Sequence, residues 1–131
     1  MNFIVNRGPT YRMSPEPEKV MNSFIPHGTL PGSERADIFN GLEHGNVPVS
    51  MFLVHNQPGD GPELHRHPYP EIFVLHAGRA RFQLDDAVLM AGAGDVVVAP
   101  TGAAHRFMNA GPGELSMTCI HTAAEMESEW L

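Results

Sequence analysis

Glycine and proline divide the chain from residue 36 onward into short apolar runs, and this division most restricts the possible fold. The runs cover residues 36–40, 47–56, 71–77, 79–84, 87–90, 95–99, 105–109 and 115–121. Turn-forming stretches such as QPGDGPE, AGAGD and AGPGE separate them. Many short strands joined by such turns indicate an all-β sandwich or barrel. No helical pattern alternates with the runs, so a parallel α/β sheet is not expected.

The N-terminal part of the chain follows another pattern. Residues 1–35 are rich in proline and are expected to be largely irregular. A short strand is expected at 2–5 and one helical turn at 16–22. This arm has little means of forming a core of its own, so we expect it to pack on the barrel or on a partner subunit.

The last ten residues predict a short helix. Thr122 and Glu125 have the spacing of a capping box, and Met126 and Trp130 lie four apart on one helical face. We therefore expect a helix over 123–130. The expected division of the chain is an arm at 1–35, a barrel at 36–121 and a helical tail at 122–131.

Length and charge exclude several classes of protein. With 131 residues the chain is long enough for one domain with one core. Lys and Arg number 8 against 15 Asp and Glu, a net charge of −7 that argues against binding nucleic acid or an anionic membrane. The one cysteine rules out an internal disulfide and favours a reducing compartment. No secretory signal or membrane-spanning run is evident, so a cytoplasmic protein is expected.

Eight histidines are many for this length, and three of them fall in a pattern suited to a metal ion. His65 and His67 are two residues apart, which on an extended segment places both rings on one face, roughly 6.5–7 Å apart at Cα. Glu71 follows after two prolines and can supply a charged ligand. His105 opens a later strand, which antiparallel pairing can bring alongside. Three imidazoles and one carboxylate suit Zn, Fe, Ni, Mn or Cu rather than Ca or Mg.

The same stretches resemble the two sequence motifs of the cupin family. The first motif, G-x5-H-x-H-x3–4-E-x6-G, is met by Gly59, His65, His67, Glu71 and Gly78. The second motif, G-x5-P-x-G-x2-H-x3-N, is met by Gly94, Pro100, Gly102, His105 and Asn109. The resemblance covers about residues 36–121 and implies a single-domain double-stranded β-helix, or jelly roll. It also implies that His65, His67, Glu71 and His105 bind one divalent transition metal ion. Small cupins are commonly homodimers, often with an exchanged N-terminal strand, so a homodimer is expected.

Alternation within the runs identifies candidate core and pocket residues. The side chains expected inside the barrel are Phe73, Leu75, Phe82, Leu84, Val96, Val98 and Phe107. Candidate walls of a pocket at the metal are Phe73, Phe107, Met51, Leu53, Tyr69 and Met117. Cys119 is expected to be buried and inert. The histidines expected to be surface or structural residues are His27, His44, His55, His76 and His121.

The donor set leaves one or two coordination positions for water, O₂ or a small substrate. We therefore expect a metal-dependent enzyme that acts on a small oxygenated molecule, with dioxygenase-like chemistry first. Glu71 would be a ligand and, if it detaches, a catalytic base. The second hypothesis is a non-redox isomerase, cyclase or lyase, and the third is a non-catalytic module that binds a small ligand. The fold alone does not choose among them.

Overall fold

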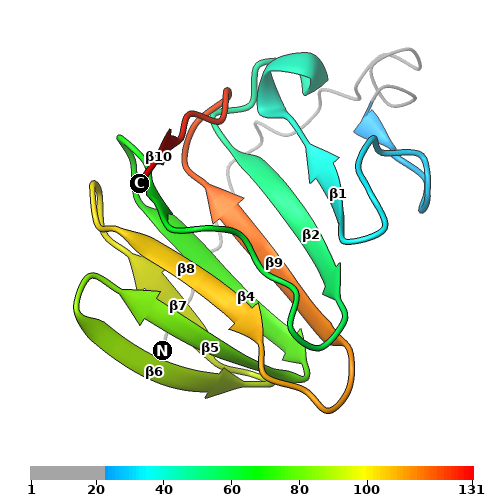
Figure 1. The fold of residues 1–131 in the computed structure, drawn as a ribbon. Coiled ribbons are helices and arrows are strands. Elements are labelled where there is room, and N and C mark those ends of the chain that lie inside the picture. Colours follow the sequence, from blue (N-terminus) through cyan, green and yellow to red (C-terminus); the bar gives the residue numbers. More distant parts are fainter. Residues whose placement is uncertain (1–22) are drawn as a thin grey trace, which may run out of the picture.

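The computed structural model describes residues 23–131, which form two five-stranded antiparallel sheets (Figure 1). The first sheet has the order β1 (Ala36–Phe39), β2 (Ser50–Asn56), β9 (Leu115–His121), β4 (Glu71–Ala77) and β7 (Val96–Ala99). The second has the order β10 (Glu129–Trp130), β3 (His65–Arg66), β8 (His105–Asn109), β5 (Arg79–Leu84) and β6 (Ala87–Gly92). A short 3₁₀ helix, η1 (Gly41–His44), follows β1. The all-β jelly-roll prediction is confirmed.

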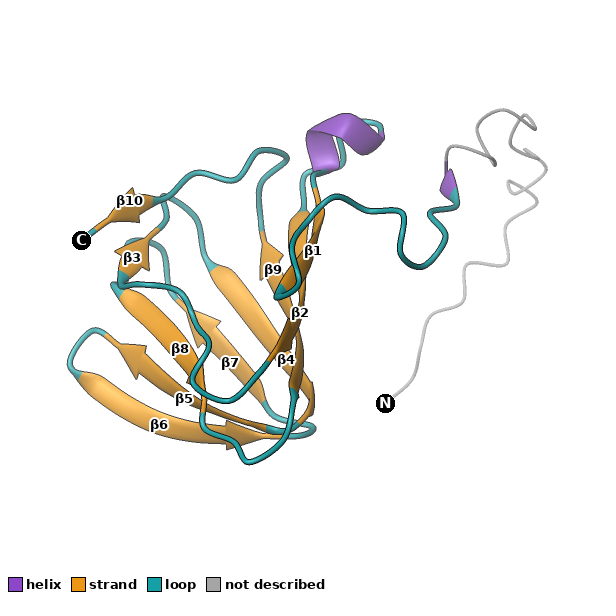
Figure 2. Cartoon of the chain, turned by 45° about the vertical axis from the view of Figure 1, so that its right-hand side comes forward, coloured by secondary structure: helices purple, strands orange, loops and turns teal. Residues whose placement is uncertain are grey.

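The core lies between the two sheets, which face each other in Figure 2. Alternate residues of β4, β5, β8 and β9 point inward, so the buried side chains come from both sheets. The largest of them are Phe73, Phe82, Leu75, Leu115 and Met117. The rings of Phe73 and Phe82 meet edge to face at 5.0 Å, an arrangement that the charge distribution of aromatic rings favours.

Strand positions agree closely with the pattern of apolar runs. The elements β4, β5, β8 and β9 have the predicted bounds, and β1, β2, β6 and β7 differ by up to three residues at one end. The strands β3 and β10 were not expected. Each has only two residues, and prolines flank β3 in sequence, so neither carries a readable alternation.

The C-terminal helix predicted over 123–130 is wrong. Thr122 does not cap a helix, because its hydroxyl donates to the backbone oxygen of Pro70. The chain bends at residues 122–125 without forming a helical turn, and Trp130 pairs with His65 in the β10–β3 ladder. Arg66 donates through two nitrogens to the Glu129 carboxylate, at 2.9 and 3.0 Å. These tertiary contacts outweigh a helical preference that is worth only tenths of a kcal/mol per residue.

The prediction that Val96 and Val98 point into the barrel is also wrong, since both side chains face outward. The β4–β7 register pairs Val96 with Val74 and Val98 with Ile72, whereas Val97 lies opposite the buried Phe73. Val96 and Val98 are 59% and 51% exposed. The run Val-Val-Val-Ala is apolar throughout, so its sequence carries no alternation from which the inward face could be read.

The expected strand at 2–5 and helical turn at 16–22 lie outside the described residues. Residues 23–35 form a bridge to β1 between Gly32 and Asp37, and the backbone oxygen of Arg35 accepts from the N–H of His55 on β2 at 2.9 Å. Within residues 23–131, the structure contains no helix with the length and apolar character needed to span a membrane.

Gly78 lies in the tight turn between β4 and β5, where the chain passes from one sheet to the other. Its φ is +86°, and a Cβ at this position would lie 2.5 Å from the backbone oxygen of Glu114. Gly94 offers a comparison, because its φ is +90° but a Cβ there would meet nothing within 4 Å.

We expect Gly78→Ala to destabilise the fold more than Gly94→Ala. The left-handed backbone costs both variants about 1–2 kcal/mol, and the backbone clash adds roughly 1–3 kcal/mol at residue 78 alone. Urea unfolding of the metal-free proteins measures the difference. Equal midpoints for the two variants would contradict the close approach of Gly78 to Glu114.

Candidate metal centre

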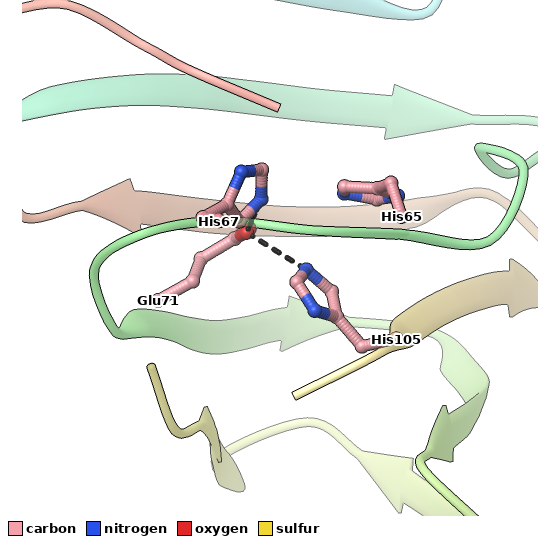
Figure 3. A group of neighbouring side chains, drawn as sticks. All are labelled: His65, His67, Glu71 and His105. Atoms are coloured by element: carbon pink, nitrogen blue, oxygen red, sulfur yellow. Dashed lines mark hydrogen bonds and ion pairs between the residues drawn. The ribbon is translucent and has the colours of Figure 1, made fainter. Parts of the chain in front are cut away.

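Four polar side chains converge between the sheets at the end where β3, β4 and β8 meet. His65 lies on β3, His67 follows it, Glu71 opens β4 and His105 opens β8. His65 and His105 are direct partners in the β3–β8 pairing. All four side chains are buried, and their ligand atoms lie within 4.8 Å of one another (Figure 3). This grouping is the one that the two motifs predicted.

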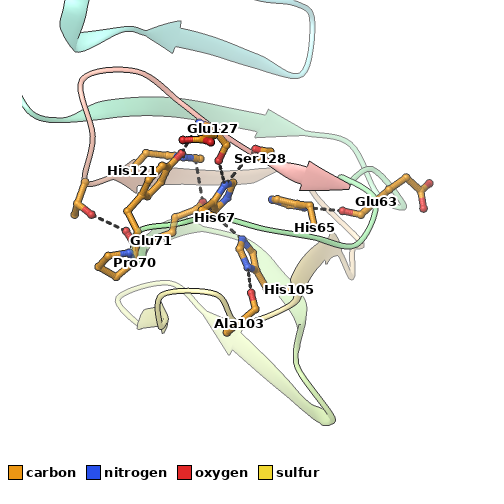
Figure 4. Close-up of polar contacts among 12 residues, drawn as sticks. Glu63, His65, His67, Pro70, Glu71, Ala103, His105, His121, Glu127 and Ser128 are labelled. Atoms are coloured by element: carbon orange, nitrogen blue, oxygen red, sulfur yellow. Dashed lines mark hydrogen bonds and ion pairs between the residues drawn. The ribbon is translucent and has the colours of Figure 1, made fainter. Parts of the chain in front are cut away.

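Each of the three histidines is oriented by a backbone carbonyl. The Nδ1 atoms of His65, His67 and His105 lie 2.7, 2.7 and 2.8 Å from the oxygens of Glu63, Glu127 and Ala103 (Figure 4). A carbonyl oxygen only accepts, so each Nδ1 carries a hydrogen. In the neutral ring each Nε2 then has a free lone pair. All three lone pairs belong to the atoms that meet in the centre.

The donor atoms fit a cation. His67 Nε2 is buried and forms no hydrogen bond, although it lies only 2.8 Å from Glu71 Oε1. His105 Nε2 lies 3.1 Å from the same oxygen. Three nitrogen lone pairs and a carboxylate held this close repel one another unless a proton or a metal ion lies among them. Three nitrogens and one oxygen are the donors that divalent transition metals prefer.

The surroundings of Glu71 and His65 favour the forms of these side chains that bind a metal ion. Burial opposes the ionised form of Glu71, but contacts with His105 and His67 and electrostatic attraction from His121 lower its pKa to about 2. Burial lowers the pKa of His65, which favours the neutral ring that binds metals. Burial also acts to lower the pKa of His105, but the hydrogen bond with Glu71 outweighs it and raises that pKa.

A cavity of about 250 Å³ opens from the donor set into the space between the sheets. Its apolar wall includes Phe52, Val54, Phe73, Phe107 and Cys119, and His65, His67 and Glu71 form its polar end. Arg35 and Asn56 also line it. Burial raises the pKa of the Cys119 thiol well above its ordinary value, in agreement with an inert residue.

Of the predicted pocket walls, Phe73 and Phe107 line the cavity, whereas Met51, Leu53, Tyr69 and Met117 do not. Met51 and Leu53 alternate with Phe52 and Val54, which line the cavity, so they face the other side of the sheet. Met117 is buried in the core but does not line the cavity. Four successive apolar residues, Met-Phe-Leu-Val, leave the inward face of β2 unreadable from sequence.

Tyr69 does not line the cavity either, but it contacts His121, which was expected to be a surface or structural residue and which lines the cavity. Its hydroxyl lies 2.7 Å from Nδ1 of His121, a buried histidine whose Nε2 is 3.5 Å from Glu71 Oε2. Burial lowers the pKa of His121 to about 4, so this ring is neutral at neutral pH. The one available signal was its place at the end of an alternating strand, since β9 sets His121 opposite Glu71.

The other histidines lie away from the centre. His55 faces Asp37, His76 bonds Thr118, and His44 stacks on Phe39. His27 is exposed in the segment before β1. Their expected surface or structural character agrees with these positions.

We expect the double variant His65→Ala/His105→Ala to lose the metal ion. Removing two of three imidazoles leaves too few donors, so affinity for Mn(II) or Zn(II) should fall by more than about 100-fold. Metal titration by calorimetry and elemental analysis measure this. The control is His76→Ala, which should bind the metal as the wild type does. Unchanged metal content in the double variant would contradict the site.

Comparison with known proteins identifies the family. The family description that matches is the cupin domain, over residues 52–121. No curated protein matches the chain in sequence. Among solved structures, oxalate decarboxylase of Bacillus subtilis, described for its Mn(II) centres, is similar with a TM-score of 0.67 and 25% identity. The match covers 76% of this chain but only 29% of that one.

A second similar structure shows the fold alone. It is a protein of Klebsiella pneumoniae with a double-stranded β-helix domain, at a TM-score of 0.63 and 19% identity. The match covers 76% of this chain and 87% of that one. The matched family covers more than half of the sequence, and the structure sets its two motifs around one donor set. The chain therefore belongs to the cupin family and is a metal-binding cupin.

Proposed function

We propose that this chain is a metal-dependent enzyme that acts on a small oxygenated molecule, with an oxygenase reaction as the first candidate. The observation that carries the proposal is the position of the donor set, which opens directly into a mostly apolar cavity of about 250 Å³. A cavity of this size admits only a small molecule. One end offers polar donors, and the walls offer aromatic and aliphatic surface.

His65, His67 and His105 would hold the ion through Nε2, and Glu71 through its carboxylate. The ion itself would be Fe, Mn, Zn, Ni or Cu, and it would supply Lewis acidity together with electron transfer if redox-active. The backbone carbonyls at Nδ1 keep the three rings aimed at the centre. Phe73 and Phe107 limit water beside the donors, which strengthens electrostatic interactions there.

Glu71 is the candidate catalytic residue in addition to its role as a ligand. Contacts with His105 and His67 keep its pKa near 2, although burial acts in the opposite direction. A carboxylate with so low a pKa is a weak base. Glu71 would gain basicity only by leaving those histidines, because burial would then raise its pKa.

A non-redox lyase is the second candidate, with isomerases and cyclases in the same class. It is supported by the likeness to the Mn(II)-containing oxalate decarboxylase, of which this chain covers less than a third. Arg35 lines the cavity and supplies one positive charge that could pair with an acidic substrate.

Oxygen uptake tests the proposal and separates the candidates. Protein loaded with Fe(II) or Mn(II) should consume O₂ with at least one member of a panel of diketones, phenols and small organic acids. Variant His105→Ala should lose this turnover, and His76→Ala should keep it. Turnover without O₂, or with Zn(II), would favour the lyase class. A ligand that raises the melting temperature without any turnover would indicate a binding module and refute the enzyme.

We further propose that two copies of the chain associate through the outer face of the first sheet. Seven apolar side chains of β2, β9, β4 and β7 lie on this face: Met51, Leu53, Ile72, Val74, Val96, Val98 and Ile120. The uncharged polar side chains of Ser116 and Thr118 and the rings of His55 and His76 lie among them. These four strands present no Asp, Glu, Lys or Arg there. A second copy can therefore meet this face without like-charge repulsion between the surfaces in contact.

We also propose a cytoplasmic location for the protein, which the single cysteine supports.

We expect light scattering to give the mass of a dimer, and Val96→Lys/Val98→Lys to give a monomer. Two charges at positions exposed by 59% and 51% would have to be buried in the interface without partners. The control is Val88→Lys, at an exposed position of β6 on the other sheet, which should remain dimeric. A monomeric wild type would refute the association.

A further inference from the structure

His121 is a fourth histidine at the metal centre, and neither sequence motif contains it. Its side chain is 2% exposed, and its ring centroid lies 4.6 Å from that of His67. The β4–β9 register sets it directly opposite Glu71, and Figure 4 shows it beside that carboxylate. Nevertheless, His121 is outside the group of four residues whose ligand atoms converge. A buried imidazole so close to a donor set needs a reason for not being a ligand.

The hydrogen bonds of Tyr69 identify the tautomer of His121. The backbone N–H of Glu127 donates to the Tyr69 hydroxyl oxygen at 3.0 Å. The same hydroxyl lies 2.7 Å from His121 Nδ1, the other hydrogen-bonding partner that the structure gives it. The phenol has one hydrogen, and donation to Nδ1 satisfies it in this buried position. His121 Nδ1 therefore accepts, and the hydrogen of the neutral ring lies on Nε2.

The position of Glu71 supports the same tautomer. His121 Nε2 lies 3.5 Å from Glu71 Oε2. With a hydrogen on Nε2, the ring presents positive charge to the carboxylate, whereas the opposite tautomer would present a lone pair to it. His65, His67 and His105 carry their hydrogens on Nδ1 because each faces a carbonyl oxygen. His121 carries its hydrogen on Nε2 instead, because its Nδ1 faces the hydroxyl of Tyr69 and not a carbonyl oxygen.

The two oxygens of Glu71 consequently have different surroundings. Oε1 faces Nε2 of His67 and His105 at 2.8 and 3.1 Å, and Oε2 faces Nε2 of His121. We propose that His121, oriented by Tyr69, is a positioning residue that holds Oε2 of Glu71 out of the donor set. Glu71 then contributes one oxygen, and the chain contributes four donor atoms. This inference rests on the proposed metal-binding role of the four residues and adds a residue that determines how many positions stay open.

Cobalt(II) provides the test, because its visible absorption reports the number of ligands independently of activity. We compare the full-length wild type with His121→Phe, His121→Gln and Tyr69→Phe, each loaded with Co(II). His121→Phe removes the N–H that faces Oε2, so Glu71 can bind through both oxygens. We expect weaker absorption, typical of a higher coordination number, and a change in Co(II) affinity of about 10–100-fold.

The two conservative variants make the test specific. His121→Gln keeps an N–H at this position and should retain a spectrum close to that of the wild type. Tyr69→Phe is nearly isosteric and removes only the hydroxyl that fixes the tautomer. It should shift the spectrum in the same direction as His121→Phe, by a smaller amount. Far-UV circular dichroism of the metal-free proteins confirms that each variant is folded, and Tyr69→Phe remains informative if His121→Phe does not fold.

The remaining outcomes overturn the inference. Wild-type spectra in both His121→Phe and Tyr69→Phe would show that neither residue acts on Glu71. Loss of Co(II) from both His121→Gln and His121→Phe would make His121 a ligand rather than a positioning residue. These results leave the metal centre itself intact, since the wild type binds Co(II) in each of them. A wild type that binds no Co(II) would refute the centre and the inference together.

Discussion

The structure depends on a carboxylate that is buried among imidazoles. An ionised side chain is costly to remove from water unless charged or hydrogen-bonding groups surround it. Glu71 stays ionised when a proton or a metal ion lies between its Oε1 and the Nε2 atoms of His67 and His105, while Nε2 of His121 faces its Oε2. These histidines come from the segment after β3 and from β8 and β9. The centre therefore holds both sheets in one relative position, since a shift of any of these segments would leave a buried charge without a partner.

The C-terminal segment belongs to this arrangement although it contributes no donor atom. The oxygen of Glu127 orients His67, and the N–H of the same residue donates to Tyr69. The ring of Trp130 lies 4.9 Å from that of His65. The hydroxyl of Ser50, fully buried, bonds the oxygens of Ala123 and Ala124 and so fixes the start of the segment. The non-helical segment makes all of these contacts at once.

Sequence reasoning succeeded where a local rule decides the outcome. Strand positions follow from apolar runs between glycines and prolines, and the grouping of His65, His67, Glu71 and His105 follows from two spaced motifs. Sequence reasoning failed where the residues show no alternation of apolar and polar side chains. The stretches Met51–Val54 and Val96–Ala99 are apolar throughout, so only pairing with β9 and β4 determines which side chains face the cavity. The short strands β3 and β10 exist because their partners are present, and no two-residue segment has a preference strong enough to predict them.

The amino-acid sequence by itself determined that the chain is an all-β domain and which four side chains would gather as metal donors. Both properties depend on the spacing of residues along the chain. Turns and the alternation of side chains in strands determine where residues at a given spacing lie in the fold. Only the tertiary structure decided the tautomer of each imidazole, that is, which of its two nitrogens carries the hydrogen. A histidine ring has two nitrogens, and the group packed against one of them decides which carries the hydrogen. For His65, His67 and His105 that group is a carbonyl oxygen, and for His121 it is the hydroxyl of Tyr69, more than fifty residues away in sequence.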